Sequence, residues 1–511
     1  MKRSLFLVAV LAALCASACS GGGSAPPPPP PMGQFSNASL NGQYAFSMSG
    51  VELASSGGLS SNFFTRIGTF TANGSGTITG GVEDVNLVTG ASRFVFTGGS
   101  YSIGADGRGT LNLTNSSGTL QFSITLTSTG GGLIIALPTD GTNTASGSFV
   151  KQSVAAFSQA GIANDYAFDL SGLDPSSAPE SVVGHLHADG AGSFTSGIAD
   201  DNDGGFTTPP TGPSSITGTY AADSLNTSDL ANFGRGVANI GGITGVFYVV
   251  DQTRFLFMET GSGGALIGSA VLQSNVPTSA AAISGGFVFV MGGTAQFDPL
   301  VRGGRFSTSG GALSNILLDQ NDAGQSLSVS AASGTYTIDS NPTGRGTATF
   351  TVNGQGTFTL VFYLISSSQG FVQDQSKDIV ADGTLLAQPS TINKPAASSN
   401  FAFNWSGVTS SSGFTDEEDI VGQLSFGSSG FTGTADLNEF GALKQFLDFG
   451  VDGNLSLTGD GTGHNTFTMN LRTNPANTNL TFFAYIGNNN TILLLSTQNV
   501  RVVAGVLNPQ P

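Results

Sequence analysis

The chain contains one sequence unit four times, and this repetition fixes the size of the folding unit. A Gly followed five residues later by Gln closes each unit, and the four closing Gln residues lie 121, 115 and 122 positions apart. A unit of this length buries about two-thirds of its unfolded surface, enough for a core of its own. The closing pairs are Gly147/Gln152, Gly268/Gln273, Gly383/Gln388 and Gly505/Gln510. We therefore predict four domains, at residues 35–155, 156–276, 277–392 and 393–511.

Each unit opens with a strand in which large apolar residues alternate with smaller ones. In the first unit Tyr44, Phe46 and Met48 fall at every second position, so they share one face of an extended chain. The only Trp of the chain, Trp405, falls on the same face in the fourth unit, which predicts that it lies in a core. The pattern recurs at residues 166–170, 287–291 and 401–405.

Tight turns separate about eight short strands in each unit, and no segment shows a clear helical period. Asn73-Gly74 and Asp189-Gly190 are preferred central pairs of two-residue hairpins, because both positions tolerate positive φ. Sequential hairpins predict an antiparallel meander, and about eight strands can close into a small barrel. The predicted fold is all-β, with four tandem small antiparallel meander barrels after a signal peptide and a Pro-rich linker. A β-sandwich is the alternative.

The first 19 residues have the pattern of an export signal. Lys2 and Arg3 supply the positive start, and an apolar run follows at residues 5–14, too short to span a bilayer as a helix. Residues 20–34 are rich in Gly, Ser and Pro. Such a composition predicts a flexible leader followed by a semi-rigid polyproline spacer.

Ala16-Ser17-Ala18-Cys19 resembles the lipobox of bacterial lipoproteins, with Ala at the position where the motif usually has Leu. The resemblance implies cleavage before Cys19 and acylation of that residue, palmitate included. Several acyl chains anchor a protein stably to a membrane. Ser20 stands where an inner-membrane retention signal has Asp, which favours the outer membrane, facing the periplasm or the cell surface. Secretion with a free Cys19 is the alternative.

The charge balance and the cysteine count narrow the classes of partner. The chain has 33 acidic and 16 basic residues, a net charge of −17, so we predict no binding to nucleic acid. Its two cysteines are Cys15 and Cys19, and signal cleavage would remove the first. The mature chain would therefore have no internal disulfide.

An Asp-x-Asn pair recurs at the end of the third predicted strand of every unit. Alternate side chains of an extended segment point the same way, so both could offer oxygen ligands to one hard cation, and calcium prefers such ligands. The alternative is that Asp and Asn fold the loop by bonding their own backbone. The candidate calcium ligands are Asp84, Asn86, Asp200, Asn202, Asp319, Asn321, Asp436 and Asn438.

A Gly-Arg-Gly turn places Arg108, Arg235 and Arg345 at matching positions in the first three units, and Thr462 replaces Arg in the fourth. Three interpretations are open for these arginines. They contact an anionic partner or a polysaccharide, they are solvated at a hairpin tip, or they pair within the chain with the Asp of the Asp-x-Asn segment.

One group of residues suits zinc in principle, because His185, His187 and Asp189 lie two apart on one predicted strand. No other unit carries them, which favours a surface or packing role. Nucleophilic catalysis has little support, since the chain contains no Gly-x-Ser-x-Gly elbow. Glycosidase chemistry with two carboxylates stays open.

Together these features predict a non-enzymatic cell-envelope lipoprotein that displays four repeated β domains. We expect it to act in binding or adhesion, with a polysaccharide or an envelope protein as partner, or as a structural surface element. Tandem copies raise the avidity for a repetitive ligand even where each site is weak. A carrier of small apolar ligands inside the barrels is the alternative, and a hydrolase acting on polysaccharide is the third, less favoured, hypothesis.

Overall fold

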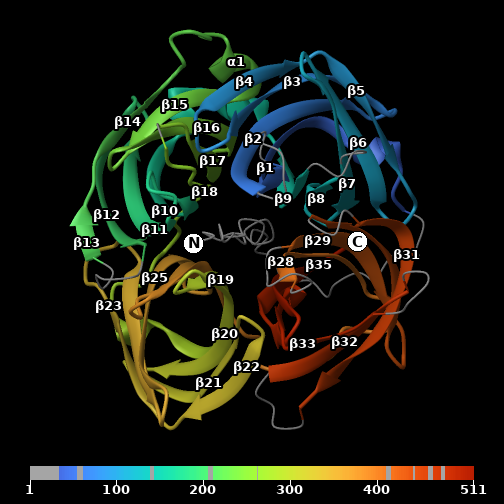
Figure 1. Ribbon diagram of the computed structural model, residues 1–511. Helices are drawn as coiled ribbons and strands as arrows, with labels where there is room; N and C mark the ends of the chain where they lie inside the picture. Colours follow the sequence, from blue (N-terminus) through green and yellow to red (C-terminus); the bar gives the residue numbers. More distant parts are fainter. Residues whose placement is uncertain are drawn as a thin grey trace.

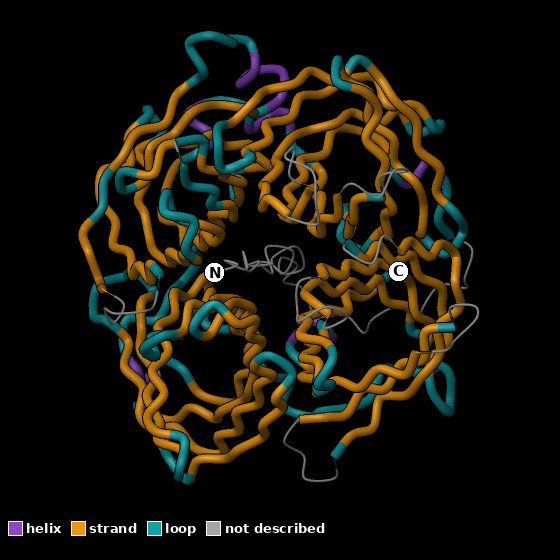
Figure 2. Tube along the Cα trace, in the orientation of Figure 1, coloured by secondary structure: helices purple, strands orange, loops and turns teal. Residues whose placement is uncertain are grey.

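A computed structural model describes residues 34–53, 61–137, 143–204, 211–261, 263–409, 416–440, 444–458, 464–472 and 478–511. Most of the described chain is β-strand (Figure 2). It forms four eight-stranded antiparallel barrels in tandem, which confirms the predicted fold class and excludes the β-sandwich. The predicted signal peptide, Cys19 and nearly all of the Pro-rich linker lie outside the described residues.

The first barrel follows the predicted up-and-down order. Its strands pair in the order β2-β1-β9-β8-β7-β6-β5-β3, the pairing of β2 with β3 closes the barrel, and β4 adds to β3 as an outer ninth strand. The strands are β1 (Asn41–Leu53), β2 (Ser61–Asn73), β3 (Thr77–Asn86), β4 (Ala91–Phe96), β5 (Gly98–Ile103), β6 (Arg108–Asn115), β7 (Gly118–Leu126), β8 (Gly132–Ala136) and β9 (Asn143–Lys151).

The second and third barrels repeat this topology, each with one outer strand, β13 or β22. Barrel 2 consists of β10 (Ala163–Leu173), β11 (Pro179–Asp189), β12 (Ser193–Asp203), β13 (Thr211–Ser215), β14 (Gly218–Ala221), β15 (Arg235–Ile240), β16 (Ile243–Asp251), β17 (Arg254–Glu259) and β18 (Ile267–Leu272), with the short helix α1 (Asp229–Phe233) before β15. Barrel 3 consists of β19 (Ser284–Ala295), β20 (Asp298–Ser309), β21 (Ala312–Asp322), β22 (Gln325–Ala331), β23 (Gly334–Ile338), β24 (Arg345–Val352), β25 (Gly356–Ser366), β26 (Gln369–Asp374) and β27 (Ile379–Ala387).

The fourth barrel is closed by eight strands without an outer one. They are β28 (Asn400–Thr409), β29 (Asp416–Phe426), β30 (Phe431–Glu439), β31 (Lys444–Leu457), β32 (His464–Leu471), β33 (Thr478–Ile486), β34 (Ile492–Ser496) and β35 (Arg501–Pro509). Five short 3-10 turns lie before or between strands: η2 (Asn37–Ser39), η3 (Val154–Ala156), η4 (Gln159–Gly161), η5 (Ala280–Ala282) and η6 (Asn488–Asn490).

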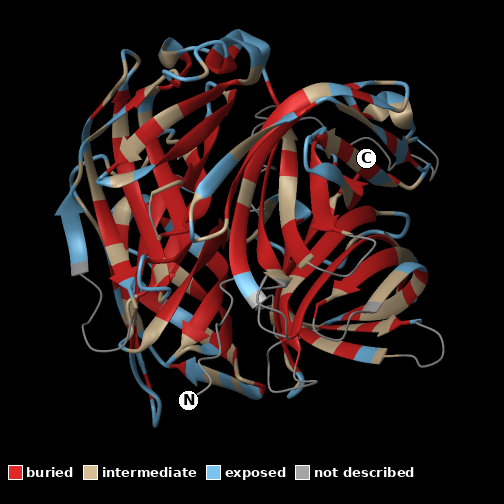
Figure 3. Ribbon diagram, turned by 45° about the horizontal axis from the view of Figure 1, so that its top comes forward, coloured by how far each residue is buried: buried red, intermediate tan, exposed pale blue. Residues whose placement is uncertain are grey.

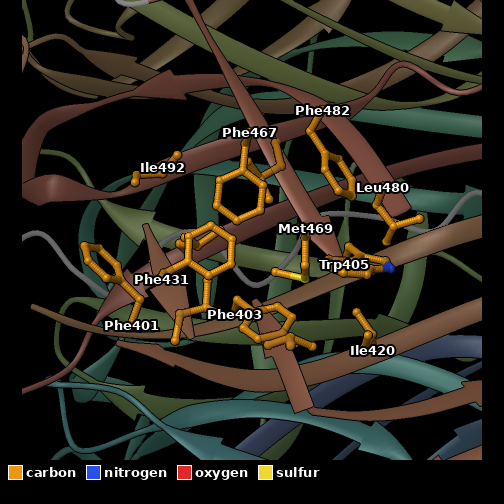
Figure 4. Close-up of a cluster of buried hydrophobic side chains, with 14 of the residues drawn as sticks. Phe401, Phe403, Trp405, Ile420, Phe431, Phe467, Met469, Leu480, Phe482 and Ile492 are labelled. Carbon is orange, nitrogen blue, oxygen red and sulfur yellow. The ribbon is translucent and has the colours of Figure 1, made fainter. Parts of the chain in front are cut away.

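Aromatic and aliphatic side chains fill the interior of each barrel. In barrel 4 the alternating residues Phe401, Phe403 and Trp405 point inward and pack against Phe467 and Phe482 (Figure 4). The side chain of Trp405 is completely buried, which confirms its predicted core position. Equivalent clusters fill the other three barrels.

A repeated Gly on the second strand makes room for the aromatic ring of the first. A Cβ on Gly68 would lie 2.7 Å from the ring of Phe46, and one on Gly184 would lie 2.5 Å from the ring of Phe168. Real Cβ atoms do not approach so closely, so only Gly allows the ring to lie flat against the strand. The same relation recurs between Gly422 and Phe403.

The four barrels surround a common centre, and the last barrel packs back on the first (Figure 1). In each pair the early strands of one barrel meet the late strands of the next: β1 and β2 contact β16 and β17, and β29 contacts β7, β8 and β9. We call these contacts seams 1/2, 2/3, 3/4 and 4/1 after the barrels that they join. Figure 3 shows that buried residues predominate along the strands and that exposed residues lie mainly in loops and at strand ends. The four barrels therefore form a closed ring.

Candidate functional site

The Asp-x-Asn side chains point out of their own barrel and into the seam. In β3, Glu83 and Val85 face the interior of barrel 1, whereas Asp84 and Asn86 face barrel 2. Alternation along a strand explains why Asp and Asn share a face, as the sequence predicted. All eight candidate residues are buried, with exposed fractions of 6 % or less.

At seam 1/2 the carboxylate of Asp84 binds Arg235 of barrel 2. Arg235 Nε and Nη2 donate to Asp84 Oδ2 and Oδ1 at 2.7 and 2.8 Å, and the hydroxyl of Tyr248 donates to Oδ2 at 2.6 Å. Burial disfavours the charge of Arg235, but the hydrogen bonds and charge of Asp84 outweigh it and raise its pKa. Burial, with the charge of Asp84, also raises the pKa of Tyr248 well above its usual value. The pair is therefore a charge-assisted bidentate contact.

Seam 2/3 repeats this arrangement. Arg345 Nε and Nη2 donate to Asp200 Oδ2 and Oδ1 at 2.7 and 2.9 Å, and the hydroxyl of Tyr363 donates to Oδ2 at 2.7 Å. The repeated Asp and Arg of the sequence therefore join neighbouring barrels. This confirms the interpretation in which the arginines pair with the Asp of the Asp-x-Asn segment.

Seam 4/1 closes the ring with the same residue types from opposite ends of the chain. Arg108 Nη2 donates to Asp436 Oδ1 at 2.8 Å and to Asp448 Oδ1 at 2.9 Å. The hydroxyl of Ser123 also donates to Asp436. This arginine uses one nitrogen for the pair with Asp436, whereas Arg235 and Arg345 use two.

At seam 3/4 a histidine takes the place of the arginine. His464 begins β32 and lies opposite Tyr485, as Arg345 begins β24 and lies opposite Tyr363. His464 Nε2 is 2.9 Å from Asp319 Oδ2, and the hydroxyl of Tyr485 donates to the same oxygen. The prediction that Thr462 replaces the arginine in the fourth unit was therefore wrong by two residues, because His464 holds that position. Thr462 itself lies outside the described residues.

The Asn of each motif holds the hairpin before the last strand of the next barrel. Asn202 Nδ2 donates to the backbone oxygens of Asp374 and Ile379 at 3.0 and 2.7 Å. Both carbonyls would otherwise be buried without a donor, which is costly. Asn86, Asn321 and Asn438 make equivalent contacts with carbonyls of barrels 2, 4 and 1.

The repeated Gly and Gln also serve these contacts. A Cβ on Gly147 would lie 2.0 Å from the backbone oxygen of Ser47, so Gly is required where β9 approaches β1. Gln152 Nε2 donates to the backbone oxygens of Phe233 and Val249 in barrel 2, at 3.2 and 2.6 Å. Gln273 and Gln510 make corresponding contacts with barrels 3 and 1.

Calcium binding by the eight Asp and Asn residues stays a prediction. Their carboxylate and amide groups already have partners across the seams. No group of three or more His, Cys, Asp or Glu side chains that could hold a metal occurs among the described residues. The sequence foresaw that Asp and Asn share a face, but the residues that they meet are more than 100 positions away.

The predicted His185, His187 and Asp189 do not converge on one point. His185 Nδ1 lies 2.7 Å from Gln273 Oε1, and His187 Nδ1 lies 2.9 Å from Asp165 Oδ1. Asp189 accepts backbone N–H groups of its own turn at 2.7 and 2.9 Å. Burial lowers the pKa of His185. These residues therefore have packing and turn contacts in this structure.

The interior of barrel 2 has an acidic end that the sequence did not predict. In barrels 1, 3 and 4 the corresponding end of the interior contains an ion pair. These pairs are Arg66–Glu83, Arg302–Asp374 and Arg501–Glu418. In barrel 2, Val182 occupies the position of Arg66 and Arg302. Each of these residues lies two positions before the Gly that pairs with a core Phe of the first strand, which is Gly184 in barrel 2 and Gly68 and Gly304 in barrels 1 and 3. The carboxyl groups there include Glu180, Asp201 and Glu259.

Burial and mutual repulsion raise the pKa values of these acids. The pKa of Glu180 is raised to about 8, first by burial and then by the charges of Asp201, Asp203, Glu259 and Asp174. Burial and the charge of Asp203 raise the pKa of Asp201 to about 6. Carboxyl groups gathered without a positive partner favour their neutral forms.

Two cavities lined by described residues are small. One inside barrel 3, between Phe287, Phe306 and Tyr336, has a volume of about 10 Å³, and one at seam 3/4, beside Val301 and Val408, about 20 Å³. Each holds about one water molecule. A pocket for a small ligand occupies about 300–1,000 Å³.

No protein-family model matches this chain, and no curated protein matches it by sequence. Among solved structures it is similar to the isotype 1 transferrin binding protein B from serogroup B Neisseria meningitidis, with 10 % identity over 74 % of this chain and 84 % of that one, at a TM-score of 0.20. A transferrin binding protein B double mutant from Haemophilus parasuis Hp5 is 13 % identical over 74 % and 82 % of the two chains, at a TM-score of 0.16. At these TM-scores the likeness supports no functional conclusion. No helix in the described ranges is long and apolar enough to cross a membrane.

Proposed function

We propose that the protein is a non-enzymatic lipoprotein of the cell envelope whose four barrels form one platform for binding or for surface structure. The closed ring of seams carries this proposal. The recurrent Asp, Asn, Arg and Gln residues serve to hold the barrels in fixed relative positions. Because the same contacts between barrels recur at the seams, the four barrels present four similar surfaces together.

A repetitive polysaccharide is the partner that suits such a platform best. Four similar surfaces at fixed spacing convert weak single contacts into avidity when the ligand itself repeats. The surface of each closed barrel is also pre-formed, which lowers the conformational cost of binding because it needs no ordering. An envelope protein is the second partner consistent with the same surfaces.

The small cavity in barrel 3 favours this platform over the carrier hypothesis for that barrel. The cavity in barrel 3 is about 10 Å³, and a small apolar ligand would require the surrounding Phe287, Phe306 and Tyr336 to move apart. Close-packed interiors resist such changes. The hydrolase stays a third hypothesis, which the binding experiment also tests by assaying each polysaccharide for cleavage.

Attachment through Cys19 is tested by metabolic labelling with palmitate and by membrane fractionation. We expect the wild-type chain to carry label and to sediment with outer membranes, whereas Cys19→Ser should be unlabelled and soluble. A labelled Cys19→Ser chain, or an unlabelled wild type, would contradict the lipid anchor.

Binding is tested by titrating the full Cys19→Ser chain with neutral and anionic polysaccharides and following the melting temperature. A ligand that binds only the native ring raises that temperature by mass action. We expect a long polysaccharide to bind much more tightly than its short oligosaccharide, because only the long chain reaches several barrels. Equal affinity for both lengths would argue against the multivalent platform.

A further inference from the structure

Seam 4/1 differs from the other three because no linker joins the barrels on its two sides. Seams 1/2, 2/3 and 3/4 each join barrels that follow one another in the chain, whereas barrels 4 and 1 are the last and the first (Figure 1). When seam 4/1 separates, the three others can remain intact. The ring can therefore open here into a curved row of four barrels.

Of the apolar clusters confined to a single seam, that of seam 4/1 is the smallest among the described residues. Four buried residues form it: Leu133, Ile135, Ala402 and Val421. Seam 3/4 has eleven such residues, seam 1/2 nine and seam 2/3 six. A further cluster joins Phe440 of barrel 4 to Val51 and Phe63 of barrel 1 and to Leu173 and Ala265 of barrel 2, and its contacts with Phe440 must also part when the ring opens. Apolar burial is the main non-directional attraction between packed surfaces, so the cluster confined to seam 4/1 contributes less of it than those of the other three seams.

In place of apolar side chains, seam 4/1 buries two carboxyl groups. Asp419 of β29 is completely buried and accepts a hydrogen bond from Thr144 Oγ1 of barrel 1 at 2.6 Å. Glu417, two residues earlier on the same face, is 2 % exposed and interacts with Asp419. The other groups that influence Asp419 are Ser406 of β28 and Glu418, whose carboxylate pairs with Arg501 inside barrel 4.

The charges elsewhere in this seam do not neutralise Asp419. Arg108 pairs with Asp436 and Asp448, and no ion pair to Asp419 or Glu417 occurs among the described residues. A buried carboxylate without a positive partner is strongly disfavoured relative to its neutral form. The closed seam is therefore most stable when these two carboxyl groups keep their protons.

We propose that the ring opens reversibly at seam 4/1, that protonation of Asp419 and Glu417 holds it closed in acid, and that it opens as the pH rises toward neutrality. Opening returns both carboxyl groups to water, where they ionise at their ordinary pH. It also uncovers the outer faces of barrels 4 and 1 that the seam hides.

The direction of the pH effect follows from proton linkage. In the closed ring burial raises the pKa of Asp419 to about 7, and burial with the charge of Asp419 raises that of Glu417 well above its usual value. Between about pH 4 and 7 the closed form therefore holds a proton on Asp419 that the open form has lost. The closure constant falls up to about tenfold per pH unit from this group, and Glu417 adds to the fall.

Seam 2/3 provides a contrast within the same molecule. It buries Asp382, whose pKa burial raises to about 7, near Asp169, Ser171 and Ser181. It also contains His185, whose pKa burial lowers, so that acid protonation of this histidine opposes the effect of the carboxyl group. A linker joins barrels 2 and 3 as well. We therefore expect seam 4/1 to respond first.

The test is fluorescence energy transfer across the seam in the full chain carrying Cys15→Ser and Cys19→Ser, so that the introduced cysteines are the only thiols. One labelled pair, Thr129→Cys with Leu447→Cys, lies on opposite sides of seam 4/1, and a control pair, Ser92→Cys with Leu225→Cys, lies across seam 1/2. All four positions are exposed. From pH 4 to 7.5 we expect transfer to fall reversibly for the first pair and to stay constant for the second.

The variant Asp419→Asn with Glu417→Gln keeps the shapes but cannot ionise. It should hold the first pair at its acid transfer efficiency up to pH 7.5, while the exposed control Asp298→Asn should behave as the wild type. Constant transfer in the wild type would overturn the proposal, and so would a parallel fall for both pairs, which indicates unfolding. An unchanged pH response in the double variant would also overturn it. The wild-type series decides the question even if the variant does not fold.

Discussion

His464 Nε2 lies 2.9 Å from Asp319 Oδ2, at the position where Arg235 and Arg345 bind Asp84 and Asp200 at the other seams. The side chain of His464 is 17 % exposed, and that of Asp319 is completely buried. One seam of the ring therefore uses an imidazole where three use a guanidinium. An imidazole offers fewer donors than the five N–H groups of Arg, so it cannot make the bidentate pair.

Changing His464 to Ala should destabilise barrel 4 and its seam. Asp319 would lose a partner while staying buried, and we expect the free energy of unfolding to fall by about 1–3 kcal/mol. His464→Arg should retain most of the stability because Tyr485 still donates to Asp319. Urea unfolding of both variants measures the effect, and equal destabilisation by Arg and Ala would show that the position has no electrostatic role.

Removing Asp200 should cost more than removing both members of its pair. Asp200→Ala leaves Arg345 buried without its carboxylate, which costs about 3–5 kcal/mol. The double variant Asp200→Ala with Arg345→Ala removes that buried charge as well. Its loss of unfolding free energy should therefore be smaller than that of Asp200→Ala alone, and smaller than the sum of the two single losses. A double-mutant cycle by urea unfolding gives the coupling energy. Strict additivity would contradict a direct pair.

Asn202→Asp should be worse than Asn202→Ala, although it changes fewer atoms. Asn202 Nδ2 donates to two backbone carbonyls, and Asp would place a carboxylate against them. We expect a loss of about 1–3 kcal/mol for Ala and a larger one for Asp at neutral pH. Thermal unfolding at pH 7 compares the two, and a milder effect of Asp would exclude the donor role of the amide.

Barrel 2 should lose stability as the pH rises, because of Glu180. The pKa of Glu180 is about 8 in the folded protein, above its ordinary value of 4.5. Below pH 4.5 the carboxyl group is protonated in both the folded and the unfolded chain, so it costs no stability there. As the pH rises from 4.5 toward 8, the unfolded chain loses this proton while the folded one keeps it, and the free energy of unfolding falls. Glu180→Gln should remove this dependence and stabilise the protein at pH 8 relative to the wild type. Unfolding free energies at pH 5 and 8 test it, with Asp298→Asn as an exposed control.

The calcium prediction can be tested by competition with Arg345. This arginine holds both oxygens of Asp200, so a calcium ion at Asp200 must displace it. Calcium should therefore raise the melting temperature of Arg345→Ala more than that of the wild type, and a chelator should reverse the rise. If calcium shifts neither protein, Asp200 and Asn202 have only their seam contacts.

The amino-acid sequence by itself determined the repeat length, the alternating strands and the all-β fold. These features depend on short-range regularities, such as the period of two that places Phe46 and Trp405 in barrel cores and the Gly residues that admit aromatic rings. The position of Asp84 beside Asn86 on one face follows from the same period. Each barrel closes through pairings within its own unit, so the repeat predicts them.

Only the tertiary structure decided what these motifs meet. Asp84 and Arg235 are 151 residues apart, and Arg108 and Asp436 are 328 apart, so no local pattern pairs them. The register that places His464 in the arginine position also depends on strand pairing with Tyr485. The ring, and the buried carboxyl groups at seam 4/1, arise because four barrels pack edge to edge until the last meets the first.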